Sequence, residues 1–193
     1  LWRFWRMLAH YHGQTWNAAE FARSLGVGES TVRRYLDLLT DAYMVRQLQP
    51  YHANIRKRQV KAPKVYIRDS GLLHQLLDIK TTDNLLTHPK IGASWEGYAI
   101  EEIIAAQQVE EAYFWASHQG AEIDLLFPHQ DGLYGVECKR TDSPKITRSI
   151  RTALQDLHLE GVKILYPGNK RFHLSEQVEA VPLVDIATKG LFI

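Results

Sequence analysis

Apolar residues in the first part of the chain recur every three or four positions, the period of a helix with one buried face. The pattern predicts a first helix that ends at Gly13 and a second over Ala18–Leu25, for which Asn17 is the expected N-cap. A third helix is predicted over about Glu29–Leu39, after the tight turn Gly26-Val27-Gly28. Helix, glycine turn and helix at this length indicate a helix-turn-helix.

The pattern changes to short apolar runs after the third helix. Tyr43–Leu48 and Lys64–Ile67 read as two strands, and Asp69 or Ser70 is placed to cap a short helix that follows. Two strands after a helix-turn-helix predict a winged helix over residues 1–79. Residues 80–89 lack a clear period and contain polar turn formers, so we expect a linker there.

The remaining residues, 90–193, alternate between helical and strand patterns. A helix is expected to follow Ser94 and run to about Gln108, and another is expected over about Ile146–His158. The predicted strands are Ala112–Ala116, Ala121–Phe127, Leu133–Lys139 and Lys163–Tyr166. This order predicts a second domain of α/β class with a mixed sheet.

Composition agrees with a folded soluble chain: of 193 residues, 45% are apolar and 23% are charged. Cys138 is the one cysteine, so an internal disulfide is excluded and a reducing compartment is expected. The sequence shows neither a signal-peptide pattern nor an apolar run long enough to cross a membrane. We therefore expect a cytoplasmic protein without a membrane partner.

The net charge of +1 is small, but basic residues gather after the predicted first strand. Between positions 56 and 68 there are six basic residues and no acidic one: Arg56, Lys57, Arg58, Lys61, Lys64 and Arg68. The third helix adds exposed donors of the kind that meet phosphates and base edges, namely Ser30, Thr31, Arg33 and Arg34. The sequence thus predicts DNA contact through this helix and through Arg56, Lys57, Arg58 and Lys61. A protein-docking winged helix stays an open alternative.

Candidate catalytic residues lie on the predicted strands of the second domain. Glu137 and Lys139 are two residues apart and leave the same face of one strand, and Asp124 lies on the preceding strand. Two carboxylates beside a lysine suit Mg²⁺ or Mn²⁺ and the hydrolysis of a phosphodiester. Glu96, from the helix, is a third candidate metal ligand, and Glu122 is a weaker one. The alternative is that Glu137 and Lys139 form an ordinary ion pair.

At these positions the chain resembles the restriction-endonuclease-like, or PD-(D/E)XK, nuclease superfamily. The resemblance assigns the strand acidic residue to Asp124, the Glu-x-Lys motif to Glu137-Cys138-Lys139, and the helical glutamate to Glu96. One difference is Ile123, which stands where the motif has proline. The implied roles are metal binding by Glu96, Asp124 and Glu137, and orientation of the attacking water by Lys139.

A second resemblance covers almost the whole chain. It is to the C-terminal region of a prokaryotic family of AAA-type ATPases, in which a P-loop ATPase precedes a winged helix and a nuclease-like domain of unsettled function. The strings that carry it include Thr31-Val32-Arg33-Arg34-Tyr35-Leu36, Asp69-Ser70-Gly71-Leu72-Leu73, Gly92-Ala93-Ser94-Trp95-Glu96-Gly97 and Gly120-Ala121-Glu122-Ile123-Asp124. It implies an ATPase domain before Leu1, and ATP would bind there because this sequence contains no Gly-x-x-x-x-Gly-Lys-Ser/Thr.

Two hypotheses about function follow. In the first, a metal-dependent nuclease-like domain and a DNA-binding winged helix form part of a larger ATPase. In the second, the nuclease-like fold is catalytically silent and serves the ATPase as a scaffold that binds nucleic acid or protein. We also expect an exposed apolar patch around Trp2 and Trp16, where the ATPase domain or a second copy of the chain docks.

Overall fold

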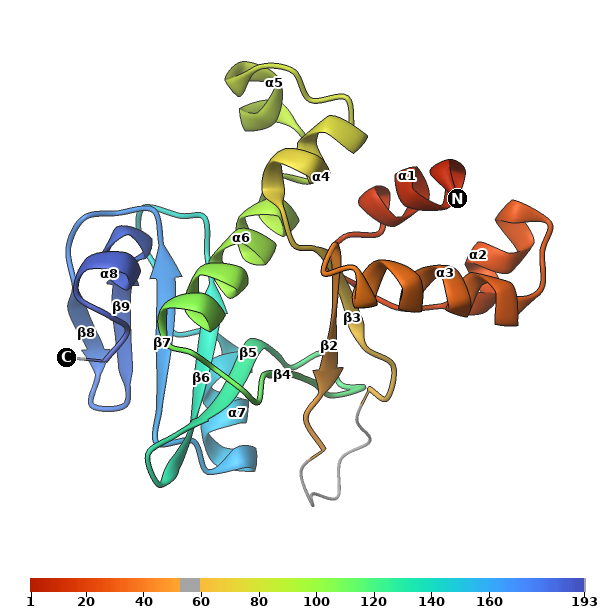
Figure 1. The fold of residues 1–193 in the computed structure, drawn as a ribbon. Coiled ribbons are helices and arrows are strands. Elements are labelled where there is room, and N and C mark those ends of the chain that lie inside the picture. Colours follow the sequence, from red (N-terminus) through yellow and green to blue (C-terminus); the bar gives the residue numbers. More distant parts are fainter. Residues whose placement is uncertain (53–59, 193) are drawn as a thin grey trace. The chain divides into compact units, whose positions relative to one another are not determined.

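The computed structural model describes residues 1–52 and 60–192, which divide into two compact units (Figure 1). The first comprises Leu1–Leu48 and Ala62–Tyr98, and the second comprises Gln49–Lys61 and Ala99–Ile193. Within the described residues there are eight helices and nine strands, and the strands pair in both parallel and antiparallel fashion. The predicted α/β class with a mixed sheet is confirmed. No helix among these residues is long and apolar enough to cross a membrane.

The first unit begins with three helices and three short strands. Their order is α1 (Trp2–His10), β1 (Gln14–Thr15), α2 (Ala18–Leu25), α3 (Glu29–Asp41), β2 (Val45–Pro50) and β3 (Lys64–Ile67). Strand β3 pairs antiparallel with both β1 and β2. The predicted cap is confirmed, since the Asn17 side chain accepts a hydrogen bond from the Glu20 N–H. Gly26 then ends α2 in the left-handed conformation, at a φ of 69°.

Three further helices complete this unit. Helix α4 (Ser70–Leu76) starts at Asp69, whose carboxylate accepts a hydrogen bond from the Leu72 N–H, as predicted. Helix α5 (Thr82–Thr87) forms inside the predicted linker, where the Thr81 hydroxyl caps its first turn. Helix α6 (Ile91–Ala106) contributes its first half, up to Tyr98, to this unit.

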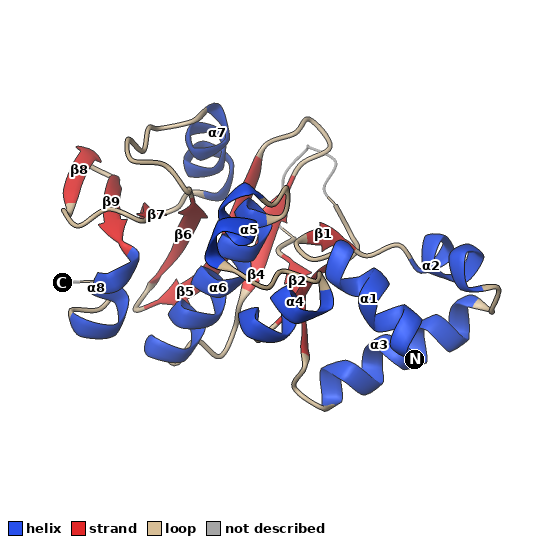
Figure 2. Cartoon of the chain, turned by 90° about the horizontal axis from the view of Figure 1, so that it is seen from above, coloured by secondary structure: helices blue, strands red, loops and turns tan. Residues whose placement is uncertain are grey.

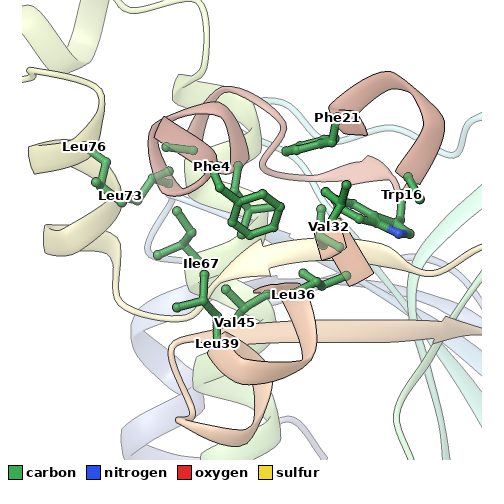
Figure 3. Close-up of a cluster of buried hydrophobic side chains, with 14 of the residues drawn as sticks. Phe4, Trp16, Phe21, Val32, Leu36, Leu39, Val45, Ile67, Leu73 and Leu76 are labelled. Atoms are coloured by element: carbon green, nitrogen blue, oxygen red, sulfur yellow. The ribbon is translucent and has the colours of Figure 1, made fainter. Parts of the chain in front are cut away.

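A cluster of buried aliphatic and aromatic side chains forms the core of the first unit (Figure 3). Trp16 lies against Phe21 with ring centroids 4.6 Å apart, and Phe4 contacts both rings. Trp16 is therefore only 7% exposed, whereas Trp2 is 61% exposed. The expected apolar patch around both tryptophans is wrong for Trp16, because the turn before α2 directs its indole into the core.

The second unit is built on a sheet of six strands. They are β4 (Tyr113–Ala116), β5 (Glu122–His129), β6 (Gly132–Cys138), β7 (Gly161–Tyr166), β8 (Phe172–Ser175) and β9 (Val178–Pro182). Their spatial order is β4-β5-β6-β7-β9-β8. The β4–β5–β6 pairs and β8–β9 are antiparallel, whereas β6–β7 and β7–β9 are parallel. Residues Gln49–Pro50 extend the sheet beside β4.

Helices cover both faces of this sheet (Figure 2). Helix α7 (Arg148–Leu157) lies on one face, where Ile150, Ala153 and Leu157 pack against Ile123 and Ile164. Helix α8 (Leu183–Thr188) lies on the other face (Figures 1 and 2). The Thr147 hydroxyl caps α7 by accepting a hydrogen bond from the Ile150 N–H. We call the face of the sheet against which α7 packs the α7 face, and the side chains of the candidate site are described relative to it.

A buried histidine links three elements of the first unit. Nδ1 of His12 accepts a hydrogen bond from the Ile67 N–H at 3.0 Å, and Nε2 lies 3.1 Å from the Ala93 carbonyl, to which it donates. Both bonds together require the neutral imidazole. The pKa of His12 is lowered to about 4, mainly by burial and further by Lys90 and His74, against an opposing effect of the Ala93 carbonyl.

We expect this histidine to make the first unit sensitive to acid. The unfolded chain takes up the proton below its pKa of about 6.5, whereas the folded unit resists protonation until about pH 4. The free energy of unfolding should therefore decrease as the pH is lowered from about 6.5 to about 4, by roughly 3 kcal/mol over the whole range. Thermal unfolding at pH 7 and pH 4.5 should show a smaller difference in His12→Gln than in the wild type. The exposed His10→Gln is the control, and an unchanged pH difference in His12→Gln would contradict the prediction.

Candidate active site at the end of strands β5 and β6

A β-bulge in β5 sets the position of Asp124. Tyr113 pairs with Leu126 and Trp115 with Ile123, so Asp124 and Leu125 together lie opposite the single residue Phe114. Such a bulge turns side chains away from the regular alternation of a strand. The ladder between β5 and β6 starts only at Leu125. Asp124 is thus placed where the two strands separate.

Beyond the start of the ladder, the Asp124 carboxylate provides the hydrogen-bond acceptor between β5 and β6. Its Oδ2 accepts a hydrogen bond from the Cys138 N–H at 2.8 Å. On the opposite edge of β6, the Lys139 N–H donates to the Leu165 carbonyl of β7. The end of β6 is therefore held on one side by a carboxylate and on the other by backbone. This arrangement fixes the strand that carries Glu137 and Lys139.

Glu137 and Lys139 lie next to this hydrogen bond and form an ion pair. The Lys139 Nζ is 2.6 Å from Glu137 Oε1. Glu137 is 4% exposed and Asp124 is 6% exposed, whereas the Lys139 side chain is 42% exposed. The buried Glu137 carboxylate thus meets an ammonium group that reaches solvent. In a medium that excludes water, charges of this kind interact more strongly than at an open surface.

Glu137 points to the α7 face of the sheet. It pairs in register with Ile164, and residues paired across neighbouring strands leave the same face. Ile164 packs with the α7 residues Ile150 and Ala153. Lys139 follows Glu137 by two residues and forms an ion pair with it, so the ammonium group lies on the same face. Cys138 alternates to the other face and is buried, as a free cysteine that packs as a small apolar side chain commonly is.

Glu96 lies in the first unit and already has two partners there. Its Oε1 accepts hydrogen bonds from the Tyr66 hydroxyl at 2.5 Å and from Lys64 Nζ at 3.2 Å. Lys64 is buried although the sequence places it in a basic stretch. Sequence reasoning therefore missed Lys64 and Tyr66 as the residues that hold Glu96. The one available signal was the apolar surroundings of Lys64 in its strand.

The predicted cation would have few protein ligands at Asp124 and Glu137. The described residues contain no group of three or more histidine, cysteine, aspartate or glutamate side chains able to hold a metal. Magnesium commonly keeps several waters and takes only one or two carboxylates. Asp124 and Glu137 are the two carboxylates that would hold the predicted Mg²⁺ in the second unit, and that assignment stays a prediction.

The predicted DNA-binding residues of the first unit have mixed environments. Ser30, Arg33 and Arg34 are exposed on α3, and Thr31 is half-buried. Arg33 has Glu29 as an ion-pair partner at 3.8 Å. Lys61 is exposed, and Arg56, Lys57 and Arg58 lie outside the described residues.

The fold and these side chains define an α/β protein of two parts, and each part matches a family without an assigned function. Residues 1–83 match the model of a domain of unknown function (DUF8612), and residues 91–186 match that of another (DUF4143). Two similar proteins are the uncharacterized protein Rv2008c of Mycobacterium tuberculosis and the uncharacterized protein Mb2031c of Mycobacterium bovis.

Each relative is 53% identical to the chain over 188 residues. The match covers 97% of this chain and 43% of each relative. The chain therefore spans less than half the length of these relatives, and it corresponds to part of a longer protein. No solved structure matches it.

The bond between Asp124 and Cys138 generates a prediction about stability. Asp124→Ala leaves the buried Cys138 N–H without this acceptor, which typically costs about 1–3 kcal/mol of the free energy of unfolding. Asp124→Asn keeps an acceptor oxygen and should cost less. The exposed turn residue Asp131 serves as a control, since Asp131→Ala should change little. Equal losses for the two Asp124 variants in urea unfolding would contradict this geometry.

Proposed function

We propose that the second unit is a restriction-endonuclease-like domain that hydrolyses DNA phosphodiesters with the help of a divalent cation. The observation that carries the proposal is the pair of buried carboxylates, Asp124 and Glu137, beside the half-exposed Lys139. Phosphodiester hydrolysis needs such a combination, because negative charge builds up on the phosphate and the nucleophile must be oriented. The order of strands and helices around the cluster also agrees with that fold.

In this proposal Asp124 and Glu137 hold Mg²⁺ or Mn²⁺, and Glu96 is a further candidate ligand. When bound, the cation polarises the phosphate and lowers the pKa of a coordinated water. Lys139 donates a hydrogen bond to the attacking water and offsets the negative charge of the phosphate. The hydrogen bond from Cys138 to Asp124 keeps the aspartate beside the end of β6.

The first unit, in the same proposal, is a winged helix that binds DNA. Helices α2 and α3 with the antiparallel strands β2 and β3 have the order of that module. Ser30, Thr31 and Arg34 lie in the N-terminal half of α3, the part of a recognition helix that normally meets base edges. Arg33, Lys61 and the undescribed Arg56, Lys57 and Arg58 are proposed to contact phosphates.

The longer protein is proposed to be an AAA-type ATPase whose other part binds ATP. In the relatives, more than half of the length lies outside the matched region, which leaves room for such a domain. A second copy of the chain is the other proposed partner. The ATPase proposal is based on the resemblance of the sequence to the C-terminal region of AAA-type ATPases.

A catalytically silent scaffold is the second candidate function, and one observation favours it. Asp124 accepts a hydrogen bond from the Cys138 N–H and Glu137 has Lys139 at 2.6 Å, so each carboxylate already has a partner within the protein. Such a cluster can hold a sheet together without a cation. Metal binding separates the two functions.

For the nuclease, we predict that calorimetric titration with MnCl₂ detects one or two sites in the wild type and none in Glu137→Ala. Asp131→Ala should bind Mn²⁺ as the wild type does. Nicking of supercoiled plasmid in Mg²⁺ should fall at least about a hundredfold in Glu137→Ala and Lys139→Ala. Absence of Mn²⁺ binding to a folded wild type would contradict the nuclease and favour the scaffold.

For the winged helix, we predict that affinity for duplex DNA falls steeply with salt. The slope of log affinity against log salt changes by about 0.9 for each phosphate that the protein no longer neutralises, so Arg33→Ala/Arg34→Ala should flatten it by about one to two. Arg6→Ala removes an exposed charge from α1 and is the matched control. An unchanged slope in the double variant would place this unit among protein-docking modules.

A further inference from the structure

A cleft of about 250 Å³ lies in the second unit, between the turn that precedes β5 and the first turns of α7. Gln119, Gly120 and Ala121 form one wall. Arg148, Ser149 and Thr152 form the other. None of these six residues is among the predicted metal-binding or DNA-binding residues.

The cleft lies at the same end of the sheet as the candidate active site. Ala121 directly precedes β5, which begins at Glu122, and β6 ends at Cys138. These strands are antiparallel, so the start of β5 lies beside the end of β6. Three residues of extended chain separate Ala121 from Asp124, which is at most roughly 10 Å.

The cleft also opens on the same face of the sheet. Helix α7 packs on this face through Ile150, and Arg148 and Thr152 are on the same helix. Glu137 leaves the sheet on this face as well, because it pairs with Ile164 of the α7 cluster. The cleft and the carboxylates are therefore neighbours rather than separate sites on opposite faces.

The lining groups favour an anion. Arg148 offers a planar guanidinium group, Ser149 and Thr152 offer hydroxyl groups, and Gln119 offers an amide. None of the six lining residues is acidic. A guanidinium group matches the geometry of two phosphate oxygens, and hydroxyl groups commonly add bonds to the same phosphate.

The segment that leads from β6 to the cleft is basic. Residues 139–148 contain four basic side chains and one acidic side chain, Asp142. The basic ones are Lys139, Arg140, Lys145 and Arg148. A segment of this charge attracts a polyanion that runs from the Glu137–Lys139 pair along the start of α7.

We propose that this cleft binds a backbone phosphate of the DNA strand whose scissile phosphate lies at Asp124, Glu137 and Lys139. The inference rests on the proposed function, because it assumes that a DNA strand is bound at the proposed nuclease site. Because Ala121 is only three residues from Asp124, the bound phosphate belongs to a nucleotide close to the scissile one. Arg148 binds the phosphate directly, and Ser149 and Thr152 add hydrogen bonds to it.

The test is fluorescence anisotropy of a labelled 20-base-pair DNA duplex with the full chain in EDTA, where no cleavage occurs. Arg148→Ala should weaken binding by about fivefold to tenfold and reduce the salt slope by about 0.9. Arg151→Ala is the matched control, since Arg151 is exposed on the same helix but does not line the cleft. It should weaken binding less than about twofold.

A second variant tests the space rather than the charge. Ser149→Phe fills the cleft without changing the net charge and should weaken binding as much as Arg148→Ala does. Thermal unfolding checks that each variant is folded. The proposal would be overturned if Arg148→Ala and Arg151→Ala changed DNA affinity equally, or if Ser149→Phe bound DNA as tightly as the wild type.

The same measurements distinguish this inference from the proposed function. If the chain binds Mn²⁺ and nicks plasmid, but Arg148→Ala and Ser149→Phe do not change its DNA binding, the phosphate-binding cleft is rejected and the nuclease is retained. If both variants weaken DNA binding, but the chain neither binds Mn²⁺ nor nicks plasmid, the phosphate-binding cleft is retained and the nuclease is rejected.

Discussion

The hydrogen bond from the Cys138 N–H to Asp124 is the interaction on which the candidate site depends. At this point the bulge has moved β5 out of register, and a carboxylate replaces the backbone acceptor that β6 would otherwise meet. The same bond places a buried acid beside Glu137 and fixes the end of the strand from which Lys139 reaches solvent. Asp124 therefore serves strand pairing and, in the proposed function, metal binding, so a change at this residue should affect both.

The first unit has a polar centre that is organised differently. Glu96 is held by Lys64 and Tyr66, and His12 is held neutral between the Ile67 N–H and the Ala93 carbonyl. These hydrogen bonds join α6 to β3 and to the end of α1. Gly97 lies at the same point, where a Cβ atom would come within 2.4 Å of His12 Nε2. Close packing around a buried polar network thus explains a glycine inside a helix, where the residue otherwise costs stability.

Much of the fold could be predicted because its signals are local. Helices α2 and α3 follow from apolar spacing, a capping asparagine and a glycine turn, and β5 and β6 follow from the alternation of residues between the two faces of a strand. Strand β1 has only two residues, which is too short for a period, and α5 depends on the single cap at Thr81. Strand β9 was missed because its pairing with β7 and the ion pair between Lys163 and Glu179 join residues far apart in the sequence. The motif of Asp124, Glu137 and Lys139 could be found, but the bulge beside it could not, because register depends on the neighbouring strand.

The central claim is that Asp124 and Glu137 together hold a divalent cation. Anomalous diffraction from a crystal grown with Mn²⁺ tests it most directly. The account predicts an anomalous peak about 2.0–2.6 Å from a carboxylate oxygen of both residues, the range of hard divalent cations bound by oxygen. A well-ordered site with no peak at these oxygens, and with the Lys139 ammonium still on Glu137, would contradict it.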